Sequence, residues 1–271
     1  MPDQGWRGGL KFSERRFILE VAIAQDRLGI GRYSASLAAA ALRDAIEKRG
    51  NARLIVATGS SQFEVLEALT QLTGIDWTKV DAFHLDEYIG LAMTHPASFC
   101  GYLRQRFVEK VPLKSFLFLD GQQDPQAVIA AASQAVTAAP IDVALVGIGE
   151  NGHLAFNDPP ADFKIREPYH IVELDEACRR QQVGEGWFDR IEQVPKTAIS
   201  MTIQQILATS KIVCSVPDRR KAAAVAASLQ GPITPDVPAS ILQQHPDITL
   251  VLEQGSASDL SAQWIHLAQK I

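Results

Sequence analysis

Apolar runs rich in β-branched residues alternate with Ala- and Leu-rich stretches along most of the chain. Short continuous apolar runs predict buried strands, at residues 53–57, 79–85, 116–119, 141–146, 211–216 and 248–252. The intervening stretches have helical periodicity and predict helices, one ending near Leu72 and others at 126–136, 220–229 and 257–270. Strands that are apolar on both faces and alternate with helices indicate a mostly parallel sheet covered on both sides.

This alternation predicts an α/β fold, a doubly wound (Rossmann-like) sheet with helices on both faces. The sequence contains no internal repeat and no long low-complexity linker, so we expect a single domain over residues 1–271. The stretch of about 155–195 is the least regular and is rich in charge, Pro and Gly. We expect it to form a lid over a site.

The composition narrows the classes of partner. The chain has 271 residues with 26 Lys and Arg against 31 Asp and Glu, a formal net charge of −5. This balance argues against a general nucleic-acid surface and a polybasic membrane anchor. No apolar run approaches the roughly 18 residues that span a bilayer, and the N-terminus lacks the apolar region of a signal peptide. We therefore expect a cytoplasmic protein that binds neither nucleic acid nor membrane.

Neither the cysteines nor the histidines are spaced as metal ligands. Cys100, Cys178 and Cys214 are odd in number and far apart, which favours reduced thiols over disulfides or structural zinc. The six histidines show no metal-ligand spacing such as HExxH. We expect no metal ion and no cofactor.

Polar residues follow the first predicted strand at Thr58, Gly59, Ser60 and Ser61. Small residues let the backbone approach an anion, and the N-terminus of the next helix adds free N–H groups. The loop therefore predicts a phosphate-binding site, although a plain helix N-cap at Ser60 or Ser61 explains the pattern equally well.

Two adjacent carboxylates, Asp86 and Glu87, follow the second predicted strand. Neighbouring side chains of an extended chain face opposite ways, so only one can point into a site. A partly desolvated carboxylate is a better base than one in water. The alternative is a turn with a capping Asp and a solvated Glu.

A glycine-dense turn at 147–152 follows the strand at 141–146 and leads to His153. Histidine titrates near neutral pH and can move the protons of sugar hydroxyls. Asp158 lies five residues further on and can orient the imidazole if the chain turns back.

Three cations, Arg219, Arg220 and Lys221, begin the helix predicted after the strand at 211–216. Cations are unfavourable at a helix N-terminus, so a bound anion such as phosphate could offset them. Arg219 and Arg220 fit a solvated basic turn equally well, whereas Lys221 begins the Ala-rich run.

Together these segments resemble the glucosamine-6-phosphate deaminase (isomerase) family, whose superfamily includes 6-phosphogluconolactonases. The matching segments keep the family order from about Leu54 to His245. They are ATGSS at 57–61, LDEYIGL at 85–91, HPASF at 95–99, GIGENGHLAFNDP at 147–159, VPK at 194–196, and Lys221 with PASILQ at 238–243.

The resemblance implies conversion of an amino-sugar phosphate to a ketose phosphate with release of ammonia, by an enzyme without a cofactor. It assigns the C2 proton transfer to Asp86 and ring opening to His153, supported by Asn151 and Asp158. The residues it assigns to the substrate and its phosphate are Thr58, Gly59, Ser60, Ser61, Glu87, Gly149 and Lys221. The expected partner is a small phosphosugar, and a homo-oligomer is compatible with the resemblance.

The chain departs from its relatives in the same segments. Asn151 stands where many relatives have Asp, and Asp158 replaces the usual Glu, which shortens its reach by about 1.5 Å. Relatives also supply an Arg to the phosphate from a segment that here has no matching Arg, and Arg179 or Arg180 could substitute.

Two other functions remain as alternatives, a 6-phosphogluconolactonase and a non-catalytic phosphosugar sensor. The AFNDP run after His153 favours the deaminase branch over lactonases. The presence of acid–base residues disfavours a sensor.

Overall fold

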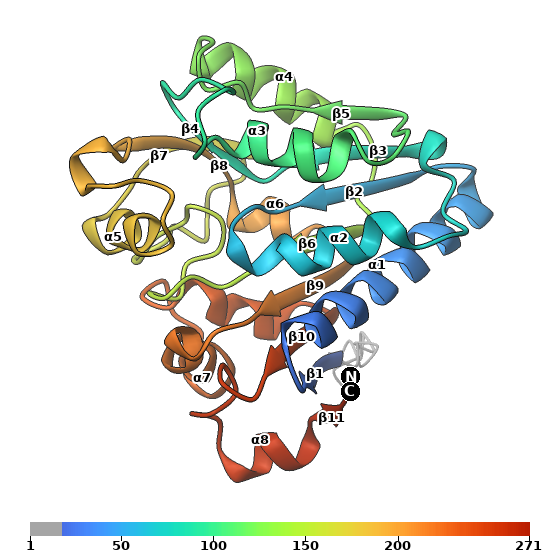
Figure 1. Ribbon diagram of the computed structural model, residues 1–271, viewed down its shortest axis with the longest axis vertical. Helices are drawn as coiled ribbons and strands as arrows, with labels where there is room; N and C mark the ends of the chain where they lie inside the picture. The colour runs from blue at the N-terminus through green and yellow to red at the C-terminus, as the bar shows by residue number, and fades with distance from the viewer. Residues whose placement is uncertain (1–17) are drawn as a thin grey trace, which may run out of the picture.

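The computed structural model describes residues 18–271 and has a fully parallel, eight-stranded sheet at its centre, in the order β11-β1-β10-β9-β6-β2-β3-β5 (Figure 1). The strands are β1 (Ile18–Ala24), β2 (Ala52–Val56), β3 (Val80–His84), β5 (Ser115–Leu117), β6 (Val143–Val146), β9 (Lys211–Val216), β10 (Asp247–Glu253) and β11 (Gln269–Lys270). The stretch 1–17, where we found no signal-peptide pattern, lies outside the described residues.

Helices cover both faces of this sheet, as predicted. One face packs against α1 (Arg27–Arg49), α2 (Phe63–Gln71) and α3 (Phe99–Leu103). The other packs against α4 (Pro125–Thr137), α6 (Ile203–Leu207) and α7 (Ala222–Gln230). Figure 1 shows α1 and α2 side by side in front of the sheet.

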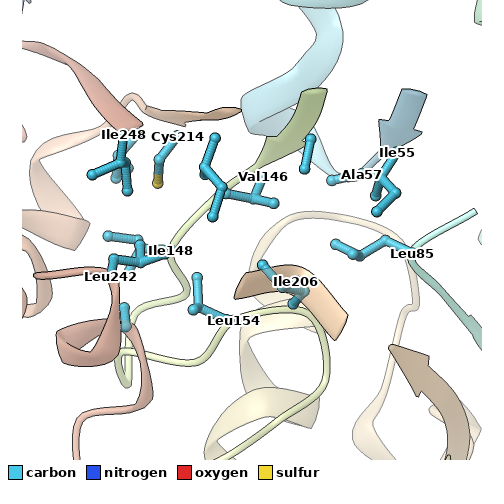
Figure 2. Packing of buried hydrophobic residues seen from close by; sticks show 14 of the residues in the cluster. Ile55, Ala57, Leu85, Val146, Ile148, Leu154, Ile206, Cys214, Leu242 and Ile248 are labelled. Carbon is cyan, nitrogen blue, oxygen red and sulfur yellow. The ribbon is translucent and has the colours of Figure 1, made fainter. Parts of the chain in front are cut away.

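The period of two along each strand explains this double covering. In β2, Leu54 and Val56 belong to the core beneath α1 and α2, whereas Ile55 belongs to the opposite core. Figure 2 shows this second core, with Ile55 and Val146 of the sheet facing Ile206 of α6. The predicted strands are therefore confirmed. Their apolar residues are buried on both faces, except in the edge strand β5, where Phe116 and Leu117 are half-buried.

A second, antiparallel sheet was not predicted. Its strands lie in the order β4 (Asp86–Tyr88), β8 (Thr197–Met201) and β7 (Tyr169–Glu173). Along the chain, α5 (Glu176–Gly184) follows β7. Aromatic side chains from Tyr88, Phe99 and Phe156 pack together beside it. The stretch 155–195, which we expected to be irregular, thus contains one strand, one α-helix and a short 3₁₀ helix at Ile191–Gln193.

The C-terminal region also differs from the prediction. The expected helix over 257–270 is confined to α8 (Ala262–Leu267), and β11 follows it. Gly, Ser and Asp between 255 and 261 favour turns instead, and the hydroxyl of Ser256 accepts a hydrogen bond from the N–H of Glu253. Among residues 18–271, no helix has the length and apolar character needed to cross a bilayer.

Candidate active site

The carboxyl ends of β2, β3 and β6, together with Lys221 from the chain that follows β9, meet at one pocket. The chain after β2 leads to β3 on one side, and β6 lies on the other side of β2. Doubly wound sheets bind ligands where the strand order reverses in this way.

The loop after β2 lines this pocket with Thr58, Gly59, Ser60 and Ser61, as the phosphate-site interpretation requires. The N-cap interpretation is wrong, because neither the short 3₁₀ helix at Ser60–Gln62 nor α2 has a side-chain cap. Gly59 has φ 89°, and a Cβ there would meet nothing within 4 Å. The turn therefore needs glycine for its backbone conformation rather than for space.

The two adjacent carboxylates separate as the strand geometry predicts. Asp86 lines the pocket, whereas Glu87 does not. The carboxylate of Glu87 accepts hydrogen bonds from Ser98 Oγ at 2.8 Å and from the N–H of Cys100 at 2.7 Å. It thereby satisfies the N-terminus of α3, so a contact between Glu87 and the substrate is not supported.

Asp86 is a buried carboxyl group with 5% of its surface exposed, and its Oδ1 has no hydrogen-bond partner within the described part of the chain. Burial and the charge of Glu87 raise the pKa of Asp86 to about 8, against a smaller opposite effect of the Thr58 hydroxyl. A carboxylate in such surroundings binds a proton strongly, which suits it to take a proton from carbon.

His153 lines the same pocket and is oriented by the carboxylate that the sequence indicated. Its Nδ1 lies 3.1 Å from Oδ1 of Asp158, and its backbone N–H donates to Oδ1 of Asn151 at 3.1 Å. Asn151 also donates from Nδ2 to Oδ1 of Asp158 at 3.0 Å. The shorter Asp158 side chain therefore reaches the ring, and the three residues form one hydrogen-bonded group.

Asp158 is held in its ionised form. Although burial favours its neutral form, hydrogen bonds from His153 and Asn151 and from the N–H of Asp175 keep the pKa of Asp158 below its ordinary value. The loop that carries His153 is anchored by Ile148 and Leu154, which are buried in the core in Figure 2. Both the position and the charge environment of the imidazole are thus fixed by the fold.

Of the three cations before α7, only Lys221 enters the pocket. It is buried, with 4% of its surface exposed. Arg220 pairs with Glu150 at 3.1 Å, and the exposed Arg219 lies 3.8 Å from Asp259. The two arginines therefore fit the solvated basic turn, and Lys221 is the cation available to an anion.

Sequence reasoning missed the contribution of α5 and the residue after it. Gln181, Gln182 and Glu185 line the pocket. The expected substitution by an arginine is wrong: Arg179 donates to the carbonyls of Ile191 and Val194, and Arg180 pairs with Glu176. The spacing of 181, 182 and 185 marks one helical face, but nothing in the sequence says what that face covers.

Within the described part of the chain, His153, Asp158 and Cys178 are the group that could hold a metal ion, since their ligand atoms lie within 4.8 Å of one another. Burial raises the pKa of the Cys178 thiol, which disfavours the thiolate that binds metals. The hydrogen bond between His153 and Asp158 already uses one atom of each. The donor set is better suited to proton transfer.

Comparison with known proteins adds family information to this geometry. Residues 28–251 match the family model described as glucosamine-6-phosphate isomerases/6-phosphogluconolactonase. Glucosamine-6-phosphate deaminase of Oenococcus oeni is 39% identical over 207 residues, 76% of this chain and 86% of the relative. That of Lactobacillus delbrueckii subsp. bulgaricus is 33% identical over 241 residues, 89% of this chain and 99% of the relative.

Solved structures agree with the fold. A monomeric glucosamine-6-phosphate deaminase superposes with a TM-score of 0.80 at 31% identity, covering 89% of this chain and 99% of that one. A structure described as that of a 6-phosphogluconolactonase from Neisseria gonorrhoeae gives a TM-score of 0.69 at 22% identity, covering 88% and 99%. The second likeness concerns the fold alone.

Proposed function

The chain belongs to the family of glucosamine-6-phosphate isomerases and 6-phosphogluconolactonases, and from that membership we propose that it is a glucosamine-6-phosphate deaminase. It converts glucosamine 6-phosphate and water to fructose 6-phosphate and ammonia. The observation that carries this proposal is the presence of two separate acid–base groups, Asp86 and the His153–Asp158 pair, in one pocket.

The reaction needs two such groups because its steps move different protons. In the proposed first step His153 accepts the proton of the C1 hydroxyl and delivers a proton to the ring oxygen, which opens the ring and exposes the aldehyde. The C2 proton is acidic only after this step, and Asp86 then removes it. Asp86 returns a proton to C1, and water adds to the resulting C2 imine and expels ammonia.

The proposed phosphate site is the opposite end of the pocket. The loop from Thr58 to Ser61 supplies hydroxyl and backbone N–H donors, and Lys221 supplies a buried positive charge. Anchoring the phosphate here leaves the sugar ring to extend past Gly149 towards His153 and Asp86. A phosphosugar is thus the proposed small-molecule partner.

A homo-oligomer remains a separate prediction, and light scattering of the purified protein tests it.

Mixing the purified protein with glucosamine 6-phosphate tests the proposal. We expect ammonia and fructose 6-phosphate in equal amounts, with both products lost in D86N. Hydrolysis of 6-phosphogluconolactone without release of ammonia would identify a lactonase instead. Binding of glucosamine 6-phosphate with no turnover would identify a sensor.

A further inference from the structure

A carboxylate occupies the proposed phosphate end of the pocket. Glu185 follows α5 directly and lines the pocket together with Ser60 and Lys221. Its Oε2 accepts a hydrogen bond from Ser60 Oγ at 3.3 Å and one from Trp187 Nε1 at 3.3 Å. Its Oε1 accepts one from Gln181 Nε2 at 2.8 Å. Glu185 is therefore built into the site rather than left on its rim.

This carboxylate is ionised in the free protein. Burial favours its neutral form, but the charge of Lys221 and the three hydrogen bonds outweigh this effect, so the pKa of Glu185 lies below its ordinary value. Lys221 is also the one Lys or Arg that lines the pocket among residues 18–271. The charges of Glu185 and Lys221 cancel, and the phosphate end has no net positive charge from these two groups.

A neutral pair of this kind does not suit a phosphate dianion. A phosphate monoester has a second pKa of about 6, so it is mostly dianionic at neutral pH. Like charges brought together in a desolvated site weaken binding, and a tenfold loss of affinity corresponds to about 1.4 kcal/mol. A singly protonated phosphate, or a sugar hydroxyl, can instead donate a hydrogen bond to Glu185 while it accepts one from Lys221.

We propose that Glu185 determines specificity by selecting a ligand group that donates a hydrogen bond as well as accepting one. The inference rests on the proposed function, in which this end of the pocket holds the C6 substituent of the sugar. Glucosamine 6-phosphate then binds with its phosphate singly protonated, and Glu185 discriminates against the dianion. The same chemistry is offered by the free C6 hydroxyl of glucosamine, so the test includes both sugars.

Titration of the protein with inorganic phosphate in a calorimeter tests Glu185 without turnover. We expect the parent to bind phosphate about tenfold more tightly at pH 5.5 than at pH 8. E185Q should bind phosphate at pH 8 about tenfold more tightly than the parent, with a weaker dependence on pH. E176Q removes an exposed carboxylate from α5, the helix that precedes Glu185, and should behave as the parent.

Other ionisable groups near Glu185 are the same in the parent and in E185Q. They are Lys221 and Tyr88, whose charges interact with that of Glu185, and Asp86 and His153, which line the same pocket. The difference between the parent and E185Q therefore isolates Glu185. Equal or weaker phosphate binding by E185Q at pH 8 would overturn the proposal. If E185Q does not fold, the parent protein alone provides the test. Phosphate binding by the parent that is no tighter at pH 5.5 than at pH 8 would also overturn the proposal.

Turnover separates this inference from the proposed function. E185Q should lower KM for glucosamine 6-phosphate at pH 8 and so raise its kcat/KM. It should raise KM for glucosamine, whose C6 hydroxyl loses the carboxylate that accepts its hydrogen bond. If the parent turns over glucosamine faster than glucosamine 6-phosphate, Glu185 selects the C6 hydroxyl. This result would support the role of Glu185 and refute the proposal that the substrate is a phosphosugar. If neither sugar is turned over, the proposed function fails, and the phosphate titration still decides the role of Glu185.

Discussion

The imidazole of His153 fills the space that a side chain on Gly149 would need. A Cβ on Gly149 would lie 2.2 Å from Nε2 of His153 and 2.3 Å from its Cε1, much closer than atoms can approach. The glycine is therefore required by the position of the ring rather than by its own backbone conformation. This contact holds the ring at the mouth of β6.

Gly149→Ala should displace the imidazole while the fold is kept. A misplacement of about 1 Å can cost about 10²-fold in rate, so we expect kcat to fall by about that factor with little change in thermal stability. Steady-state kinetics and thermal unfolding measure the two effects. Gly184→Ala is the control, since a Cβ there meets only Arg220, at 3.9 Å. A fully active Gly149→Ala enzyme would contradict the role of His153.

Asp86→Asn should preserve substrate binding and lower kcat by about 10²–10⁴-fold, the usual effect of removing a general base. Exchange of the C2 proton with deuterated solvent, followed by NMR, should disappear with it. Glu87→Gln is expected to weaken the start of α3 and to retain the exchange. Loss of exchange in the Glu87 variant alone would assign the base to Glu87.

Asp86→Asn should also stabilise the protein at neutral and alkaline pH. The pKa of Asp86 is about 8 in the folded protein, and about 3.9 is usual for an unfolded chain. Between these values the folded state binds one more proton, so the parent loses stability as the pH rises. The difference in Tm between variant and parent should grow from pH 4 to pH 8. A constant difference would show that Asp86 ionises normally.

Asp158→Asn should impair ring opening in particular, because Asp158 is the carboxylate hydrogen-bonded to His153. We expect kcat on the cyclic sugar to fall by about 10²-fold, within the range for acid–base groups. Activity on an open-chain analogue should fall far less. Equal losses on the two substrates would mean that Asp158 supports the fold or the later chemistry instead.

Lys221→Ala should raise KM for phosphorylated substrates by about 10- to 100-fold, since a charge-assisted hydrogen bond contributes roughly 1.5–3 kcal/mol. Inorganic phosphate should inhibit the parent more strongly than the variant. Arg219→Ala removes a neighbouring exposed cation and should change neither value. Equal inhibition of Lys221→Ala and the parent would place the phosphate elsewhere.

The sequence predicted those strands that can be recognised from their own run of apolar residues. The run at 141–146 is apolar except for Asp142, which is typical of a buried strand, and β6 confirms this prediction at Val143–Val146. By contrast, β4 has three residues and pairs with β8 far along the chain. Such pairing depends on contacts between distant segments, which no local pattern records.

The same distinction holds within the site. His153 and Asp86 follow buried strands directly, so their positions at one edge of the sheet were predictable. Glu185 reaches the pocket only because α5 packs there, and its polar sequence resembles that of any solvated helix. Residues placed by tertiary packing were therefore the ones that the sequence did not identify.

The small antiparallel sheet connects Asp86, the proposed base, to the stretch 155–195 through paired strands. Asp86 pairs with Ser200 of β8, and Ser200 pairs in turn with His170 of β7. A lid that swung as a whole from 155 to 195 would have to break the β7–β8 pairing or pull Asp86 out of position. Any movement of this stretch that keeps the three strands paired therefore leaves Asp86 in place.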